Sequence, residues 1–547
     1  MADGRFRTRM PANEPVLSYE PGTPERAELK DTVRRMGGRE IEIPLVIGGK
    51  NVKTGRLGDC RAPHEHDHLL GRWHKAQKKE VDQAIVAAEK AWHDWSRMDW
   101  ADRAAIFLRA AELLAGPHRQ TVNAATMLGQ SKTCHQAEID SACELIDFWR
   151  FNVNYLQQIY EEQPESAPGI WNRMEYRPLE GFVFAVTPFN FTSIAGNLPT
   201  APALMGNTVL WKPASSAVYS AHYLMEVLHE AGLPPGVINF VPGSGGDVGD
   251  PAFASASLAG VHFTGSTEVF QGVWKTIGTN IAAYRNYPRI VGETGGKDFV
   301  FAHPTADVGE VAAGLVRGAF EYQGQKCSAA SRAYIPKSLW KRVEKELLTQ
   351  IGEIRMGDPT DFTNFMGAVI DKGAFRDISG YIAHAKRSKD ATVIAGGKCD
   401  DSKGWFIEPT VVLTTNPEHK LMREEIFGPV LTIHVYPDRQ LDKALELCDT
   451  ASPYALTGAV FARDRRAVVH MADKLRHTAG NFYINDKPTG AVVNQQPFGG
   501  SRASGTNDKA GSKQNLQRWV TPRSIKETFV PPRHFSYPFL APDASAD

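Results

Sequence analysis

Short apolar segments alternate with amphipathic helical segments from Gly181 onward, and this alternation constrains the fold more than any other feature of the chain. Residues 220–231 have helical spacing and end at Gly232. The segments with the length and apolar content of buried strands are 182–186 (FVFAV), 208–212 (TVLWK), 237–241 (VINFV) and 261–264 (VHFT). Strands that alternate with helices form parallel sheets, because parallel neighbours need a long crossover connection. A second stretch of this kind runs from about 307 to 500, so we expect an α/β protein.

The segments around these units follow other patterns. Residues 80–114 predict a pair of amphipathic helices with a break near 96–100, and residues 136–160 predict a third helix. Residues 169–177 and 519–529 alternate apolar and polar side chains, which is typical of half-exposed strands. Such strands present free edges, so we expect them to form an arm that contacts another subunit.

The composition excludes several classes of partner and location. Lys plus Arg and Asp plus Glu are both 62 in 547 residues, so no excess positive charge draws the chain to nucleic acid or anionic lipid. No segment approaches the roughly 18 consecutive apolar residues of a membrane span. The N-terminus has no apolar secretory region, and the six cysteines form no CxxC pair. We therefore expect a cytoplasmic protein, or one of the mitochondrial matrix if the source is eukaryotic.

Two glycine-containing turns indicate a nucleotide site. Gly243–Gly249 (GSGGDVG) follows a predicted strand, but its spacing differs from the usual dinucleotide fingerprint, and a plain glycine-rich turn is an equal alternative. The segment HFTGST places Gly265 and Ser266 at the start of a helix, where free N–H groups and the helix dipole favour a phosphate.

The segment HEHDH, His64–His68, contains side chains that could bind a metal ion. In a short polar segment, however, adjacent side chains point to opposite sides, and no further group of ligands lies nearby in the sequence. We therefore expect no metal site.

Three residues together fit one reaction. Cys327 lies in a small, polar segment (GQKCSA), where a reactive thiolate is one interpretation and a buried apolar side chain the other. Glu293 lies among glycines in GETGGK, and Asn190 follows the end of a strand in PFNF. With a dinucleotide site, these groups predict aldehyde oxidation: Cys327 attacks the carbonyl, Asn190 and a backbone N–H hold the oxyanion, and Glu293 activates the hydrolytic water.

Motifs that follow one another along most of the chain resemble those of the aldehyde dehydrogenase superfamily, from about residue 10 to 530. They are PFNF (188–191), LWKP (210–213), FTGST (263–267), GETGGK (292–297), GQKCS (324–328), EEIFGPV (424–430) and NFYINDKPTG (481–490). A narrower set is similar to the branch that oxidises L-glutamate γ-semialdehyde, formed from Δ1-pyrroline-5-carboxylate, to L-glutamate in proline degradation. That set is ANEPVL (12–17), AEID (137–140), EYQGQKCSA (321–329), AGNFYINDKPTG (479–490) and QQPFGGSRASGTNDKAG (495–511).

The resemblance implies Cys327 as nucleophile, Glu293 as general base and Asn190 as oxyanion donor. It also implies NAD as the cofactor, with Lys212 at the adenine ribose and Glu425 at the nicotinamide ribose. The implied cofactor-binding residues are Thr187, Lys212, Gly265, Ser266, Thr267, Glu425 and Phe427. Residues 214–216 contain no acidic side chain to exclude a 2′-phosphate, so NADP stays an alternative.

For the substrate, the resemblance implies that the backbone of Gly490 and Ala491, with Ser328, surrounds the α-carboxylate. Ala491 stands where some relatives have Ser. Phe189 and Phe498 would pack on the aliphatic chain. Glu144 would enter the site from a helix, and a structural salt bridge is an equal alternative for this residue.

The resemblance further implies a Rossmann-type NAD-binding domain (1–160 and 181–305), an α/β catalytic domain (306–505) and a β-flap oligomerisation arm (161–180 and 506–547). We expect a homo-oligomer, a dimer or higher, with a small-molecule substrate. Related bifunctional proteins carry a flavin domain for which 547 residues leave no room, so a separate proline dehydrogenase is expected to supply the substrate. The alternatives are a broader aldehyde dehydrogenase and a catalytically silent member of the superfamily.

Overall fold

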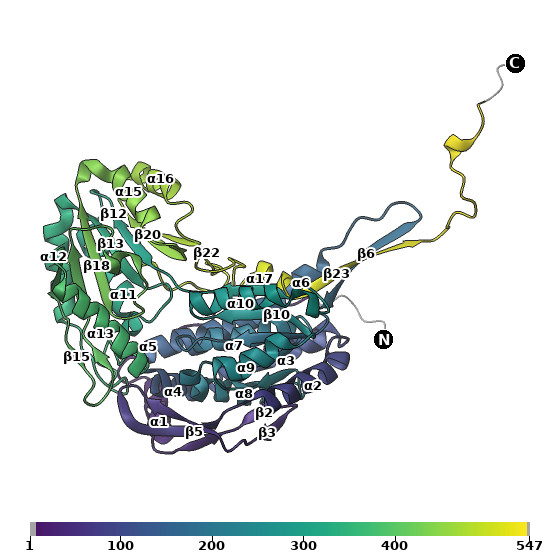
Figure 1. Cartoon of the computed structure of the whole chain (residues 1–547), viewed down its shortest axis with the longest axis horizontal. Helices are drawn as coiled ribbons and strands as arrows, with labels where there is room; N and C mark the ends of the chain where they lie inside the picture. The colour runs from purple at the N-terminus through teal and green to yellow at the C-terminus, as the bar shows by residue number, and fades with distance from the viewer. Residues whose placement is uncertain (1–6, 544–547) are drawn as a thin grey trace.

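Two seven-stranded sheets organise the computed structural model, which describes residues 7–543 (Figure 1). The first has the order β11-β10-β7-β8-β9-β2-β3 and is parallel from β11 to β9. Its strands are β2 (Leu45–Ile47), β3 (Lys50–Val52), β7 (Phe182–Val186), β8 (Thr208–Lys212), β9 (Ile238–Phe240), β10 (Leu258–Thr264) and β11 (Arg289–Glu293). The predicted strands and their parallel arrangement are confirmed.

The second sheet has the order β14-β17-β18-β13-β12-β20-β21, and only β14 is antiparallel to its neighbour. Its strands are β12 (Asp298–Ala302), β13 (Ala330–Pro336), β14 (Ala391–Ala395), β17 (Thr410–Thr414), β18 (Val430–Tyr436), β20 (Thr457–Phe461) and β21 (Asn481–Ile484). The domain boundary predicted after residue 305 therefore needs correction, because β12 already belongs to this sheet. The four residues between β11 and β12 are too few for a crossover helix, so the chain passes directly from one sheet to the other.

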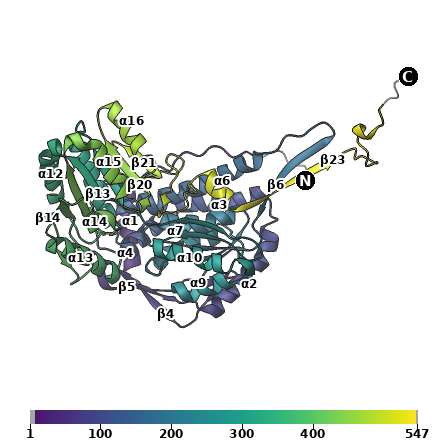
Figure 2. The same cartoon turned by 45° about the horizontal axis from the view of Figure 1, so that its top comes forward.

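Helices connect and cover the strands of both sheets (Figure 2). The helices of the first sheet are α7 (Thr192–Leu204), α8 (Val218–Glu230), α9 (Gly245–Ala254) and α10 (Thr267–Thr279). Those of the second sheet are α11 (Val308–Phe320), α12 (Lys337–Gly352), α13 (Lys372–Arg387), α15 (Leu441–Thr450) and α16 (Arg465–Lys474). The predicted helix pair is α2 (Lys78–Trp95) and α3 (Trp100–Ala115). No helix within residues 7–543 is long and apolar enough to cross a membrane.

The third predicted helix is divided in three. It consists of α5 (Cys134–Ala137), a π-helical turn (Glu138–Cys143) and α6 (Glu144–Glu161). A π turn inserts an extra residue and changes the direction of the side chains that follow. Helix α6 packs against α3 and α7 and contributes to the large hydrophobic core beside the first sheet.

The HEHDH segment lies at the start of β5 (Glu65–His74), which pairs with β4 (Leu57–Ala62). Its imidazoles have separate partners: His66 packs on the Trp405 ring at 4.8 Å, and His68 Nε2 lies 2.8 Å from Gly37 O. Within the part of the chain that the structure describes, no group of three or more His, Cys, Asp or Glu is arranged to hold a metal ion.

The two half-exposed strands pair with each other. Strand β6 (Ile170–Pro178) runs antiparallel to β23 (Val520–Thr528), and the ribbon projects from the body of the molecule (Figure 1). The segment before β23 is not free: α17 (Lys513–Gln517) packs on α6. The arm is therefore shorter than the predicted 506–547.

Candidate active site

A cleft of about 500 Å³ opens at the carboxyl ends of β7, β8 and β10. Ligands of parallel sheets bind at this edge, where the connecting loops leave room. The cleft brings together the predicted nucleophile, the predicted oxyanion donor and every predicted cofactor residue except Thr267. These lining residues are Cys327, Asn190, Thr187, Lys212, Gly265, Ser266, Glu425 and Phe427, with Phe189 beside them.

The nucleotide end of the cleft is built from helix N-termini and glycines. The Ser266 hydroxyl caps α10 by accepting from Val269 N, and Gly245 and Gly249 of α9 also line the cleft without side chains. Lys212 lies at the end of β8, where burial lowers the pKa of its ammonium group. The positive end of a helix, bare backbone and one lysine form a donor set that suits a dinucleotide pyrophosphate and ribose.

Thr267 has a different place. Its hydroxyl accepts from Gly295 N at 3.4 Å and donates to Ala503 O at 3.4 Å. The side chain therefore joins two turns at the side of the cleft.

Cys327 follows a run of unusual backbone. Tyr322, Gln323 and Gly324 have φ values of 51°, 55° and 66°, and left-handed residues other than glycine concentrate at functional sites. This turn brings the half-buried Cys327 to the cleft, where the Asn190 amide donates to Gln325 O at 3.0 Å. Burial, followed by the charges of Asp298, Glu425 and Glu293, raises the pKa of the Cys327 thiol well above its usual range.

Glu293 ends β11 and does not line the cleft. Its carboxylate accepts from Gly500 N at 3.1 Å, and its backbone pairs with Gly505. Burial raises the pKa of Glu293 well above its usual value. The carboxylate is thus held by the 497–500 turn, and a charge on it contributes to the raised pKa of the Cys327 thiol.

Glu425, a predicted cofactor residue, belongs to a buried polar cluster near Cys327 whose other members were not predicted from sequence. The Glu425 carboxylate accepts from Gly296 N at 2.9 Å, and burial raises its pKa to about 7. Lys297 donates to Ser331 Oγ at 2.5 Å, and burial lowers its pKa to about 7. Arg332 donates to Lys297 O at 2.8 Å. Lys297 lies inside the GETGGK motif, so a signal existed there, whereas nothing marked Arg332.

Of the predicted substrate residues, only Phe189 lines the cleft, and the others lie on separate segments. Ser328 Oγ is 2.8 Å from the Thr489 hydroxyl, which brings Ser328 to the loop of Gly490 and Ala491. Gly490 has a φ of 95°, a conformation that glycine adopts without strain. Phe498 is held by two backbone hydrogen bonds with Ala510, while Phe189 packs edge-on against the Phe427 ring at 5.8 Å.

Glu144 belongs to a buried hydrogen-bond network at the start of α7. Its carboxylate accepts from Ser193 Oγ at 2.6 Å, and the same hydroxyl lies 2.9 Å from Asp140 Oδ1. The ion pair of this network joins Lys132 to Asp140 at 2.5 Å. Burial, with the Asp140 charge, raises the pKa of Glu144 to about 8. The sequence indicated two members of this network, Glu144 as a predicted substrate residue and Asp140 in the AEID motif.

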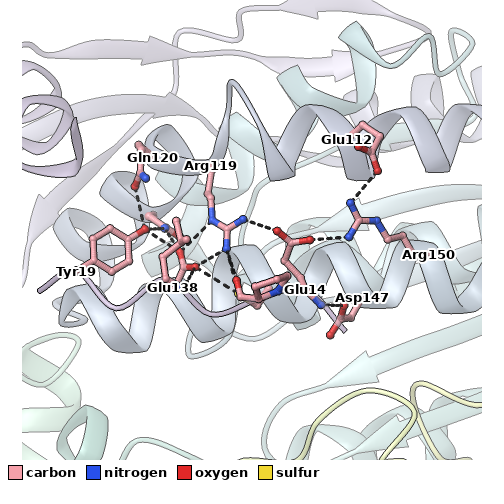
Figure 3. A network of polar contacts seen from close by, with 12 residues as sticks. Glu14, Tyr19, Glu112, Arg119, Gln120, Glu138, Asp147 and Arg150 are labelled. Atoms are coloured by element: carbon pink, nitrogen blue, oxygen red, sulfur yellow. Dashed lines mark hydrogen bonds and ion pairs between the residues drawn. The ribbon is translucent and has the colours of Figure 1, made fainter. Parts of the chain in front are cut away.

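A second buried network fixes the N-terminal segment beside these residues (Figure 3). Glu14 accepts from Arg119 and from Arg150, each at 2.6 Å. Arg119 also pairs with Glu138 at 2.5 Å, and Tyr19 donates to Glu138 at 2.8 Å. The ANEPVL motif is therefore a structural element that lies along α6.

Comparison with known proteins gives concordant results. Residues 52–525 match the aldehyde dehydrogenase family. The chain is 52% identical over 533 residues to the mitochondrial delta-1-pyrroline-5-carboxylate dehydrogenase of Dictyostelium discoideum, covering 97% of this chain and 96% of that protein. The crystal structure of the delta-pyrroline-5-carboxylate dehydrogenase from Mycobacterium tuberculosis is similar with a TM-score of 0.96 and 54% identity, covering 99% of this chain and 100% of that chain. The structure of the same enzyme bound with NAD gives a TM-score of 0.95 and 54% identity, covering 98% and 100%.

Proposed function

Because the chain belongs to the aldehyde dehydrogenase family, we propose that it oxidises L-glutamate γ-semialdehyde to L-glutamate with NAD⁺, the second step of proline degradation. The observation that carries this proposal is the cleft that joins Cys327 and Asn190 to the dinucleotide-type turn of α10. The near full-length similarity to delta-1-pyrroline-5-carboxylate dehydrogenases supports the choice of substrate.

In the first half of the reaction, the Cys327 sulfur forms a bond to the aldehyde carbon. The carbonyl oxygen becomes an oxyanion, which the Asn190 amide and the Cys327 backbone N–H stabilise. When bound, NAD⁺ accepts the hydride that this carbon releases, and a thioester remains on the sulfur. Because burial raises the pKa of the thiol, its proton must pass to a base or to water before the sulfur attacks.

In the second half, water hydrolyses the thioester. Glu293 takes a proton from the water as the oxygen attacks the acyl carbon, and the Cys327 thiolate leaves. Substrate binding is assigned to the Gly490 and Ala491 backbone with Ser328 for the α-carboxylate. Phe189 and Phe498 pack on the chain, and Glu144 supports the wall of the site through Ser193.

Residues that hold NAD are proposed to be those lining the cleft, with Thr267 supporting them from the side. The first sheet forms the cofactor domain and the second sheet the catalytic domain. The β6–β23 ribbon serves as the oligomerisation arm, and a separate proline dehydrogenase supplies the substrate. The matrix of the mitochondrion is the proposed location if the source is eukaryotic, and the cytoplasm otherwise.

The direct test supplies the purified chain with Δ1-pyrroline-5-carboxylate and either NAD⁺ or NADP⁺ and follows the reduced cofactor. We expect turnover with NAD⁺ and none from the C327A variant. Good turnover of simple aliphatic aldehydes without turnover of the semialdehyde would instead favour a broader aldehyde dehydrogenase. A folded chain that is inactive with both would favour the catalytically silent alternative.

A further inference from the structure

The 497–500 turn holds the carboxylate of Glu293 through its backbone. Gly500 N donates to Glu293 Oε2 at 3.1 Å. Gly499 approaches so closely that a Cβ there would lie 3.0 Å from Glu293 Oε1. The place of this carboxylate therefore depends on where the turn is held.

Lys509 binds this turn from behind. Its ammonium donates to Gly499 O at 3.0 Å and to Gly480 O at 2.8 Å, so it joins the turn to the residue before β21. Asn481 completes the link, because its Oδ1 accepts from Gly499 N at 3.1 Å and lies 3.4 Å from Lys509 Nζ.

The backbone at Lys509 is unfavourable for a lysine. Its φ is 52°, and within the same loop Gly505, Asn507 and Gly511 also have positive φ values of 138°, 56° and 75°. Glycine or asparagine suits such positions better than a long side chain. Because the backbone conformation does not favour lysine at this position, its presence indicates a role for the ammonium group.

The positive charge of the Lys509 ammonium group also affects the pKa of Glu293. Burial raises the pKa of Glu293, and the positive charge of Lys509 lowers it, while Asp508 raises it. Asp508 is itself paired with Arg518 at 3.4 Å. Cys327 is a further titratable group nearby, and its raised pKa favours the neutral thiol.

We infer that Lys509 is the positioning residue of Glu293: it holds the turn that binds the carboxylate and supplies a positive charge that favours the ionised form needed for thioester hydrolysis. This role rests on the proposed function, in which Glu293 acts only after the thioester has formed. Loss of Lys509 should therefore slow hydrolysis while leaving thioester formation intact.

The test compares the full-length chain with K509M, K509Q and K509R in single-turnover and steady-state reactions across pH. In K509M we expect a rapid burst of one NADH per site at a rate within about twofold of the unmodified chain, followed by a steady state slowed about 10- to 100-fold. The acid limb of kcat should move to higher pH. K509Q, which keeps a hydrogen-bond donor without the charge, should show the same pH shift. K509R should restore most of the rate. K513M is the matched control, because Lys513 lies four positions away in an exposed pair with Glu162.

Two results would overturn the positioning role: an unchanged pH profile in both neutral variants, or a burst that falls in parallel with the steady state. If K509M does not fold, K509Q and K509R decide between these results. Hydrolysis of a p-nitrophenyl ester, which acylates the same thiol without an aldehyde, separates the two proposals. If the chain hydrolyses the ester but does not oxidise the semialdehyde, only the proposed substrate is refuted. The Lys509 variants are then compared by their rates of ester hydrolysis.

Discussion

Asn190 and Cys327 lie close together because a hydrogen bond joins the two turns that carry them. The amide of Asn190 is 4% exposed and donates to Gln325 O, two residues before the thiol. This bond occupies the amide in the free chain. The amide nitrogen carries a second N–H, which is available to donate to the oxyanion at little cost because the group is already fixed and away from water.

The Asn190→Ala variant should therefore lose rate and keep most of its substrate binding. Removing one oxyanion donor costs about 10²- to 10³-fold in kcat. Steady-state kinetics with the semialdehyde measure this loss, and the exposed N51A variant on β3 serves as control. Equal kcat values for the two variants would contradict the assigned role.

The buried Glu144 predicts a pH dependence of stability. Its pKa of about 8 in the folded chain exceeds the value of about 4.3 for an unfolded glutamate. The folded chain therefore holds a proton that the unfolded chain has lost, so the stabilising contribution is complete at low pH and disappears as pH rises through about 8.

The Glu144→Gln variant keeps a neutral side chain at every pH. Relative to the unmodified chain, we expect its melting temperature to gain more at about pH 9 than at about pH 6. Thermal unfolding at both values measures this difference, with the exposed E28Q variant as control. A difference that does not change with pH would show that Glu144 is not protonated in the folded chain.

At the scale of elements, the π-helical turn at residues 138–143 directs acidic side chains to opposite sides. Glu138 reaches Arg119 at the N-terminus of α4 (Arg119–Gln130), whereas Asp140 reaches Lys132 and the start of α7. Asn13 of the N-terminal segment connects Asp147 on α6 to Val493 O beside the predicted substrate loop, at 2.8 and 2.9 Å. Helix α6 thus carries Glu144 at its start and is connected through Asn13 to the predicted substrate loop.

The Arg119→Met variant leaves the fully buried Glu138 without its cation, and Glu14 with one fewer. Breaking a buried pair by removing one partner costs about 3–5 kcal/mol, so we expect a clear fall in the urea midpoint. The K341M variant on α12 is the matched control, because that lysine is 85% exposed and such pairs contribute about 1 kcal/mol or less. Equal midpoints for the two variants would show that the network in Figure 3 does not stabilise the fold.

At the scale of the whole molecule, the projecting arm and the segment after it expose apolar surface. Phe535, Tyr537 and Phe539 are 81%, 68% and 80% exposed, beyond the end of β23. Adjacent apolar side chains of this size are typical of an interface and not of a monomer surface. We therefore propose that the last residues of the described chain form part of the interface of the proposed homo-oligomer.

Replacing Phe535, Tyr537 and Phe539 together with serine should weaken assembly. Each large side chain contributes about 1.5–3 kcal/mol when buried, so dissociation should become at least about 100-fold easier. Sedimentation at several concentrations checks this against the chain mass of 60.2 kDa. The V86S variant, which removes an exposed side chain of α2, is the control. Identical masses at every concentration would exclude the tail from the interface.

The strands, crossover helices and glycine turns could be predicted from sequence because each depends on residues close together in the chain. The parallel α/β class, the turn at Gly265 and Ser266, and the motifs around Cys327, Glu293 and Asn190 are local patterns of this kind. Local patterns also predict the two strands of the arm, but they do not predict that these strands pair with each other.

The tertiary structure alone decided which of these local pieces meet. Gly500 reaches Glu293 across 207 residues, Lys509 reaches Gly480 across 29, and Lys132 meets Asp140 through the π turn. The tertiary structure likewise decided that β12 pairs within the second sheet although it follows β11 of the first sheet after only a short turn. Such contacts are selected by burial and by hydrogen-bond satisfaction over the whole fold, and no short segment contains that information.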